Sequence, residues 1–163
     1  MRLTKEQLAQ RWEITDLGEP SKIIGIEIRR GSDFLSISQQ CYIEAILRKE
    51  NMERANPVAT PLDANIPIEP NPEESDGNRS NPFAHLLGEL QYLANATRPD
   101  IAFAVNRLAS YTANPSMKHY DMLKRILRYL SGTKTYEITY RRSYTKQAPL
   151  HHRKGTIIER DLV

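Results

Sequence analysis

The sequence of 163 residues lacks the features that mark several large protein classes. Cys41 is its only cysteine, which excludes an internal disulfide framework and any zinc site built from several cysteines. No stretch approaches the ~18 apolar residues of a membrane-spanning helix, and the N-terminus lacks the apolar run of a signal peptide. We therefore expect an intracellular protein, cytoplasmic or nuclear, with no membrane partner.

Motifs of common enzyme classes are also missing. There is no glycine-rich phosphate loop, no zinc-protease motif and no nucleophile elbow. No two aspartates are adjacent, whereas two-metal phosphoryl transfer needs carboxylates close enough to hold both cations. Asp100 and Asp121 could be single ligands, but each is more simply a polar residue in an early helical turn. The sequence predicts no catalytic residue, no metal site and no resident cofactor.

Isolated reactive side chains do not change this conclusion. Cys41 could be a nucleophile, but its place beside the apolar face of a helix favours a buried or inert thiol. The pair His151-His152 could bind a metal, but no third ligand stands at a suitable spacing. Glu73-Glu74 lies in a loose, proline-rich stretch and is expected to be solvated.

Charge is unevenly distributed behind a net charge of +3. Residues 51–97 carry two basic and seven acidic side chains, a net of −5. Residues 98–142 carry nine basic and three acidic side chains, a net of +6. A basic segment can mark a nucleic-acid binder, or it can be the solvated face of a helix rich in lysine and arginine. Charge by itself favours the second interpretation.

Hydrophobic spacing predicts an α+β fold. After a short helix near Thr4, the β-branched segment 23–28 and the segment 34–38 should pair as a β-hairpin. A helix is predicted over 39–50 from apolar residues at helical spacing. Residues 51–81 contain five prolines, which disfavour both helix and central strand, so we expect an extended, partly mobile connection.

A bundle of about three helices should follow the connection, between residues 82 and 132. Gly132 is expected to cap the last helix, 135–140 to form a strand, and 143–163 to be an unrelated, disordered tail. The expected inward-facing residues of the bundle are Phe83, Leu86, Leu87, Leu90, Leu93, Ile101, Val105, Leu108, Tyr120, Leu123, Leu127 and Leu130.

Seven short motifs occur in order along the chain. They are Asp16-Leu17-Gly18-Glu19-Pro20, Ile24-Gly25-Ile26-Glu27-Ile28, Ser38-Gln39-Gln40-Cys41-Tyr42, Ala59-Thr60-Pro61-Leu62, Leu87-Gly88-Glu89-Leu90-Gln91-Tyr92-Leu93, Thr97-Arg98-Pro99-Asp100-Ile101-Ala102 and Arg125-Ile126-Leu127-Arg128-Tyr129-Leu130-Ser131-Gly132-Thr133. Each motif is weak alone, but the ordered set is specific. It resembles the reverse transcriptase of Ty/copia-type retrotransposons, over residues 8–142 and downstream of the catalytic palm carboxylates.

The resemblance implies part of an RNA-directed DNA polymerase from a Pol polyprotein, an incomplete domain of a polymerase right hand over residues 1–142. Residues 1–38 would be the end of the palm with a primer-grip-like hairpin, 39–50 a thumb helix, and 51–81 a connection. Residues 82–142 would be thumb and connection helices with a strand. Such polymerases hold two Mg²⁺ ions on palm aspartates, which this sequence lacks, so the ions would belong to the parent polymerase.

The resemblance also implies contact with the backbone of an RNA–DNA or DNA duplex. Gly25 would let the backbone approach a primer strand, or would only relieve packing within a strand. Cations of the hairpin and of the last helix would neutralise phosphates, or would simply be solvating charges. The candidate residues are Lys22, Gly25, Arg29, Arg30, Lys124, Arg125 and Arg128. Arg98, ahead of Pro99, is expected instead to cap or pair with carbonyl groups.

Two functions follow. The resemblance implies a reverse transcriptase fragment without catalysis of its own, which the remainder of the polymerase would complete in the parent. Alternatively, the chain would be a retained RNA- or DNA-binding or protein-interaction module without enzymatic activity.

Overall fold

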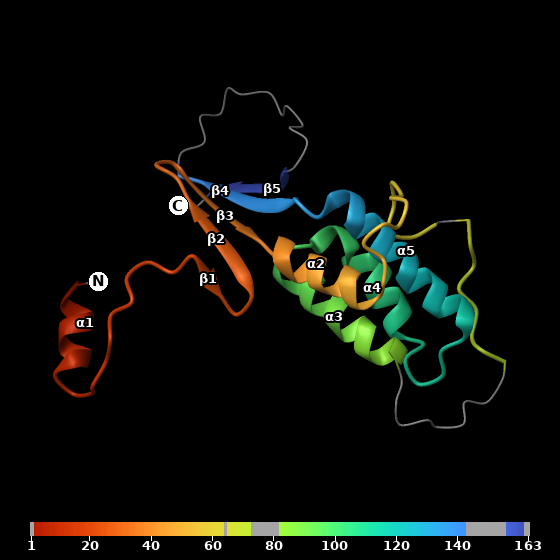
Figure 1. The fold of residues 1–163 in the computed structure, drawn as a ribbon, viewed down its shortest axis with the longest axis horizontal. Helices are drawn as coiled ribbons and strands as arrows, with labels where there is room; N and C mark the ends of the chain where they lie inside the picture. Colours follow the sequence, from red (N-terminus) through yellow and green to blue (C-terminus); the bar gives the residue numbers. More distant parts are fainter. Residues whose placement is uncertain (1, 64, 73–81, 143–155, 162–163) are drawn as a thin grey trace.

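The computed structural model describes residues 2–63, 65–72, 82–142 and 156–161 and has an α+β fold, in which a small sheet adjoins a body of helices (Figure 1). The helices are α1 (Arg2–Ala9), α2 (Gln40–Lys49), α3 (Pro82–Ala96), α4 (Ala102–Ala109) and α5 (Met117–Thr133), with a 3₁₀ turn η1 (Pro99–Ile101). The strands are β1 (Lys22–Ile23), β2 (Ile26–Arg30), β3 (Phe34–Ser38), β4 (Glu137–Arg141) and β5 (Thr156–Asp161). The predicted fold class is confirmed.

The sheet is built on the predicted hairpin. Its strands lie in the order β1-β2-β3-β4-β5, antiparallel except for the parallel pair β4 and β5. Ile28 pairs with Ile37, and Ile37 pairs with Ile138, so these three β-branched residues share one face of the sheet. The chain thus returns from the helical body to add β4 to the hairpin.

A tight turn at Ile24 and Gly25 interrupts the first predicted strand. Both residues have positive φ, 49° and 76°, and Ile23 pairs directly with Ile26 across them. Two-residue hairpin turns with positive φ at both positions match the twist of the strands they join. The β-branched sequence 23–28 concealed this turn, because isoleucine favours strands and rarely adopts positive φ.

The helical body encloses the hydrophobic core. α2, α3, α4 and α5 contribute its buried residues, and the spacing that predicted them is confirmed at every position except Tyr120, which is half-buried. Leu90, Leu93, Leu127 and Leu130 are completely inaccessible to solvent. Ser116 caps α5 through its side chain, as expected of a serine ahead of a helical repeat.

The described part of the connection, residues 51–63 and 65–72, has neither helix nor strand, as predicted, but it is fastened to the helical body. Tyr111 Oη donates a hydrogen bond to the carbonyl of Ile68 at 3.0 Å. Leu62 and Ile68 also pack against the hydrophobic core. Apolar side chains and backbone carbonyls thus anchor these residues, and the partial mobility expected of the connection stays a prediction.

Two further predictions differ from the structure. Gly132 lies inside α5, which continues to Thr133 and has Lys134 as its C-cap. A Cβ at Gly132 would lie 2.9 Å from Cβ of Pro57, so this glycine allows the connection to approach the helix closely. Within the predicted disordered tail, Thr156–Asp161 form β5, since the outer edge of β4 offers backbone partners. The rest of that tail lies outside the described residues.

Candidate nucleic-acid interface

Arg29, on β2, forms an ion pair within the sheet. Its Nη2 donates to both carboxylate oxygens of Glu137 on β4, at 2.5 and 2.6 Å, and its Nε donates to Ser36 Oγ at 3.3 Å. The arginine side chain is 68% exposed and that of Glu137 is 24% exposed, so the pair remains open to solvent. Its net contribution to stability is therefore expected to be small, about 1 kcal/mol or less.

Arg30 and Lys22 lie near the edge of the same sheet. Arg30 Nη1 donates to the carbonyl of Pro20 at 2.8 Å, and its Nε lies 3.9 Å from a carboxylate oxygen of Glu19. Arg30 thus ties β2 to the segment that leads into β1. Lys22 is exposed on β1, and its positive charge contributes to lowering the pKa of Glu27.

Gly25 occupies the second position of the β1–β2 turn, where its positive φ favours glycine. A Cβ there would meet only Tyr92 Oη, at an ordinary contact distance of 3.8 Å. Tyr92 Oη also donates a hydrogen bond to the carbonyl of Ile24, which holds the turn against α3. The glycine therefore serves a turn, and the interpretation that it relieves packing within a strand is wrong.

The three candidate cations of α5 face different partners. Lys124 lies 3.7 Å from Asp121 and 4.9 Å from the centre of the Tyr120 ring. Arg125 Nη2 donates to Thr60 Oγ1 at 3.1 Å and lies 3.8 Å from Asp63.

Arg128 Nε donates to the carbonyl of Asn56 at 2.8 Å. Together with Arg125, it fastens the connection to α5. The hairpin projects to one side of the molecule, whereas most of α5 lies on the other (Figure 1). The structure thus places the seven candidates in two groups on different elements and gives several of them partners within the chain.

Arg98 is the most deeply buried charged group of the described residues, with no exposed surface. Its Nε and Nη2 donate to the two carboxylate oxygens of Asp100, at 3.0 and 2.7 Å. Its Nη1 donates to the carbonyl of Thr133 at 2.9 Å, and its Nη2 also donates to Thr133 Oγ1 at 2.6 Å. The expected pairing with a carbonyl group is confirmed, and Arg98 joins the start of η1 to the end of α5.

Two tyrosines complete this buried arginine site. The guanidinium carbon lies 5.7 Å from the centre of the Tyr129 ring and 5.4 Å from that of Tyr136, within the range of cation–π attraction. Burial, as the larger cause, and a hydrogen bond to Asp100 together raise the pKa of Tyr129 to about 12. Asp100 therefore serves as the partner of Arg98 and Tyr129.

Sequence reasoning missed two buried polar contacts. Thr97 Oγ1 donates to Gln39 Oε1 at 2.9 Å, and neither residue has exposed surface, so the contact ties the start of α2 to the end of α3. His119 accepts a hydrogen bond from the backbone N–H of Ser116 at Nδ1, at 3.0 Å, which leaves Nε2 to donate to the carbonyl of Glu69 at 2.9 Å. A search for capping boxes that admitted histidine at the third helical position would have found the contact between Ser116 and His119.

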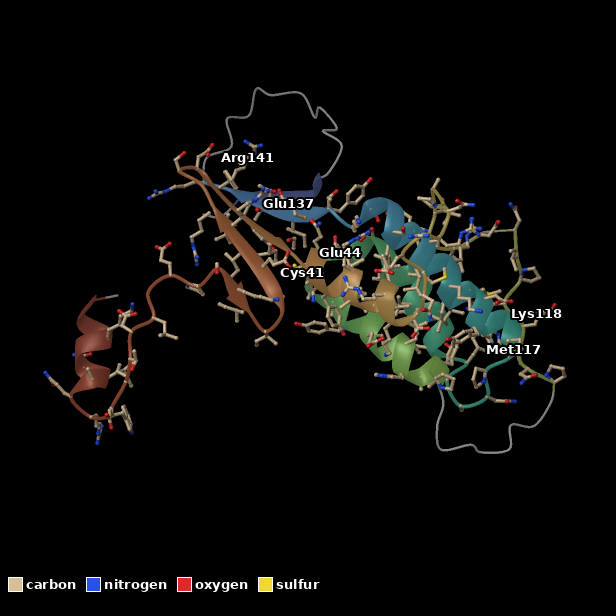
Figure 2. The ribbon with its side chains drawn as sticks, in the orientation of Figure 1. Cys41, Glu44, Met117, Lys118, Glu137 and Arg141 are labelled. Carbon is tan, nitrogen blue, oxygen red and sulfur yellow. The ribbon has the colours of Figure 1, made fainter. Side chains whose placement is uncertain are left out.

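Cys41 is exposed at the sheet end of α2, where Figure 2 also shows Glu44, so of the two alternatives, a buried or an inert thiol, the buried one is wrong. It lies off the stripe that α2 buries. A hydrogen bond to Glu27 and the charge of that carboxylate raise the pKa of Cys41. Burial raises the pKa of Glu27, but hydrogen bonds from Cys41 and Ser38 outweigh it, and that pKa is lowered. A protonated thiol is a poor nucleophile.

Within the part of the chain that the structure describes, the acidic residues do not fit a pair of Mg²⁺ ions. Asp100 is bound to Arg98, and Asp121 lies beside Lys124 on the surface of α5. Within the described ranges, no three histidine, cysteine or acidic side chains come together as a metal site. His151-His152 and Glu73-Glu74 lie outside those ranges. Among the same residues, no helix has the length and apolar character needed to cross a membrane.

Comparison with known proteins places the sequence in a family. Residues 1–64 match the family model described as reverse transcriptase (RNA-dependent DNA polymerase). The chain is 38% identical, over 79% of its length, to the retrovirus-related Pol polyprotein from transposon TNT 1-94 of Nicotiana tabacum. It is 40% identical, over 87% of its length, to the corresponding polyprotein from transposon RE1 of Arabidopsis thaliana.

The chain spans about 10% of the length of each of these two polyproteins. It is also 37% identical, over 78% of its length, to an "uncharacterized mitochondrial protein" of Arabidopsis thaliana. The matched part makes up 52% of that protein. No solved structure matches the chain. The sequence is thus that of a reverse transcriptase fragment, of the family found in the Pol polyproteins of copia-type retrotransposons.

Proposed function

We propose that this chain is the part of a reverse transcriptase that follows the catalytic carboxylates, and that it does not polymerise DNA alone. The observation that carries the proposal is the use of its carboxylates. Asp100 neutralises buried Arg98, Glu137 pairs with Arg29, and Glu27 receives hydrogen bonds from the start of α2 and from Ser38. In the parent polymerase, Mg²⁺ would be held by aspartates outside this sequence.

Apolar exposure supports the proposal that the rest of a polymerase completes this chain. We define the N-terminal arm as residues 8–24, which run from the end of α1 to the β1–β2 turn. Six of the nine large hydrophobic residues that the structure exposes belong to this arm: Leu8, Trp12, Ile14, Leu17, Ile23 and Ile24. The arm lies within the part matched by the reverse transcriptase model, so the missing portion of that domain is its proposed partner.

Primer extension tests the absence of catalysis. The purified chain, an RNA template with an annealed DNA primer, Mg²⁺ and the four deoxynucleotides should yield no extended primer. A complete retroviral reverse transcriptase serves as the positive control under the same conditions. Reproducible extension that follows the chain through a second purification, and is lost when Asp100→Asn replaces the wild type, would contradict the proposal.

The second candidate function is binding of a nucleic-acid duplex without catalysis. The observation in its favour is the net charge of +6 over residues 98–142, together with the exposed cations of the hairpin. Lys22, Arg29 and Arg30 of the hairpin would contact phosphates, as would the separate group Lys124, Arg125 and Arg128 of α5, while the Gly25 turn would approach the primer backbone. Because phosphate contacts release counterions, binding should weaken steeply as salt rises.

A titration with an RNA–DNA hybrid at two salt concentrations tests this second function. Binding that weakens as salt is raised, and weakens further in Arg29→Ala, would support it. No binding, or binding that does not respond to salt, would contradict it.

A further inference from the structure

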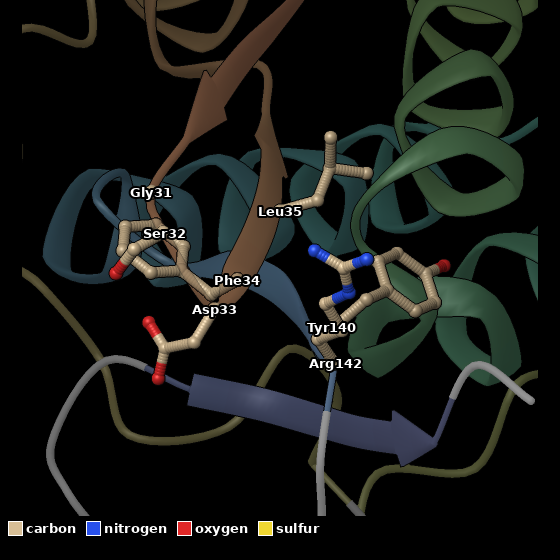
Figure 3. A pocket seen from close by; sticks show the side chains of 7 residues that line it. All are labelled: Gly31, Ser32, Asp33, Phe34, Leu35, Tyr140 and Arg142. Carbon is tan, nitrogen blue, oxygen red and sulfur yellow. The ribbon is translucent and has the colours of Figure 1, made fainter.

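A shallow pocket of about 240 Å³ lies where the β2–β3 turn meets the end of β4. Gly31, Ser32 and Asp33 come from the turn, Phe34 and Leu35 from β3, and Tyr140 and Arg142 from β4 and the residue beyond it. Figure 3 shows the side chains of Ser32, Asp33 and Phe34 gathered at one side and those of Leu35, Tyr140 and Arg142 at the other.

The backbone fixes this arrangement. Leu35 and Tyr140 are direct partners across β3 and β4, so their side chains share one face of the sheet. The backbone N–H of Arg142 donates to the carbonyl of Asp33 at 2.8 Å, which holds the two sides of the pocket together. A Cβ at Gly31 would lie 2.2 Å from the Phe34 ring, so the ring packs over the turn as only glycine permits.

The polar groups of the pocket differ from the cations chosen from the sequence. Arg29 pairs with Glu137, and Arg128 is bonded to the connection. Within the described ranges, the side chains of Arg142 and Asp33 have no ion-pair partner, and both residues are exposed. Beside two aromatic rings, the pocket therefore offers a free cation and a free carboxylate.

The size and chemistry of the pocket select a small, flat ligand. Pockets for drug-sized molecules measure about 300–1,000 Å³, so this one suits a single heteroaromatic ring system. Aromatic side chains stack on nucleobases irrespective of sequence, an arginine neutralises the neighbouring phosphate, and a carboxylate accepts the amino groups of a base. A base in a duplex cannot enter, because both its faces are stacked and its edge is paired.

We propose that this pocket binds one unpaired nucleotide of a single strand, with its base against Tyr140 and its phosphate at Arg142. The inference rests on the proposed function only in taking nucleic acid as the ligand. It assigns the site to the β2–β3 turn, at the other end of β2 from the Gly25 turn. The carboxylate of Asp33 favours bases with an exocyclic amino group, so cytosine, adenine and guanine should bind better than thymine.

Fluorescence anisotropy with a labelled six-nucleotide single strand of DNA tests the proposal on the full chain. Tyr140→Ala should raise the dissociation constant about tenfold, since loss of one stacked base costs about 1–3 kcal/mol. Tyr140→Phe keeps the ring and should bind like the wild type. Arg142→Ala should also weaken binding and reduce its dependence on salt.

Matched controls separate the pocket from general charge and apolar surface. Phe103→Ala removes an aromatic ring that is 74% exposed on α4, and Arg107→Ala removes an exposed cation from the same helix. Both should bind the single strand like the wild type, and a duplex of the same sequence should bind more weakly than the single strand. Circular dichroism checks that each variant is folded. If Tyr140→Ala is not folded, the dissociation constant of Arg142→Ala alone is compared with those of the controls.

The proposal is overturned if the single strand does not bind, if the controls weaken binding as much as the pocket variants, or if the duplex binds equally well. Primer extension gives an independent result. Catalysis there would contradict the proposed function and would leave this comparison of dissociation constants unaffected.

Discussion

The helical body buries its large apolar residues, whereas the N-terminal arm exposes them to solvent. In the body, Leu90 and Leu127 have no exposed surface, whereas in the arm Leu17 is 91% and Ile24 is 82% exposed. The body is closed by contacts within the chain, including a connection that hydrogen bonds fasten to α5 and to the segment between α4 and α5. Exposed apolar residues on this scale support the proposal that the rest of a polymerase covers the arm.

The same contrast holds for charge. Arg98 of the body is buried and fully bonded, whereas Arg29 of the sheet forms an ion pair that is open to solvent. A buried charge must find its partners inside the protein, whereas an exposed one can exchange them for water or for another molecule. The body therefore depends on its polar contacts for stability, while the sheet can offer its own for binding.

Replacing Arg98 with alanine should have the largest effect on stability. Asp100 would lose its cation, and the Thr133 carbonyl would lose one of its two donors, keeping only the backbone N–H of Tyr136. Breaking a buried pair in this way costs about 3–5 kcal/mol of the free energy of unfolding. Urea unfolding followed by circular dichroism measures the loss.

Arg29→Ala is the matched control for that experiment. It also removes an arginine from an ion pair, but from an exposed one, and should cost less than about 1 kcal/mol. Equal losses in the two variants would remove the distinction between the body and the sheet.

Two glycines of the body sharpen the role of the connection. A Cβ at Gly88, on the exposed side of α3, would meet nothing within 4 Å, so Gly88→Ala should stabilise the protein by about 0.5–1 kcal/mol. Gly132→Ala gains the same helical preference but pushes against Pro57, and should destabilise it by about 1 kcal/mol. Thermal unfolding of both variants gives the comparison, and stabilisation by both would show that the connection does not press on α5.

Tyr129 should make the stability of the body depend on pH at the alkaline end. Its pKa of about 12 in the folded protein exceeds the ordinary value of a tyrosine, so folding favours the protonated phenol. Its contribution is fully present below the unfolded pKa of about 10 and is lost as the pH rises through the folded one. The absorbance of the phenolate follows this titration, and Tyr129→Phe should abolish the corresponding loss of stability. An ordinary pKa for every tyrosine would contradict it.

The helical core could be predicted from the sequence because its apolar residues recur at helical spacing, and each helix signals its own burial. The turn at Ile24 and Gly25 could not, since a β-branched residue in a left-handed conformation goes against its local preference. Tyr92, far along the chain, supplies the hydrogen bond that holds it.

The candidate interface was predictable only in part, for a related reason. Arginines in a basic segment are visible in the sequence, but their partners are not. Glu137 reaches Arg29 only because β4 pairs with β3, and Asn56 meets Arg128 only because the connection crosses α5. Gly132 was predicted to end a helix for the same reason, because the sequence does not show that Pro57 packs against this position.

Amide hydrogen exchange, measured residue by residue on the intact chain, tests most directly the division into a closed body and an open arm. Amides of α3 and α5 should exchange slowest, through global unfolding, because their hydrogen bonds surround the buried core. Amides of the arm between α1 and β1, residues 13–21, should exchange nearly as fast as in an unfolded peptide. Protection of the arm equal to that of α3 would contradict the account, because it would show that this chain already covers the surface assigned to the rest of the polymerase.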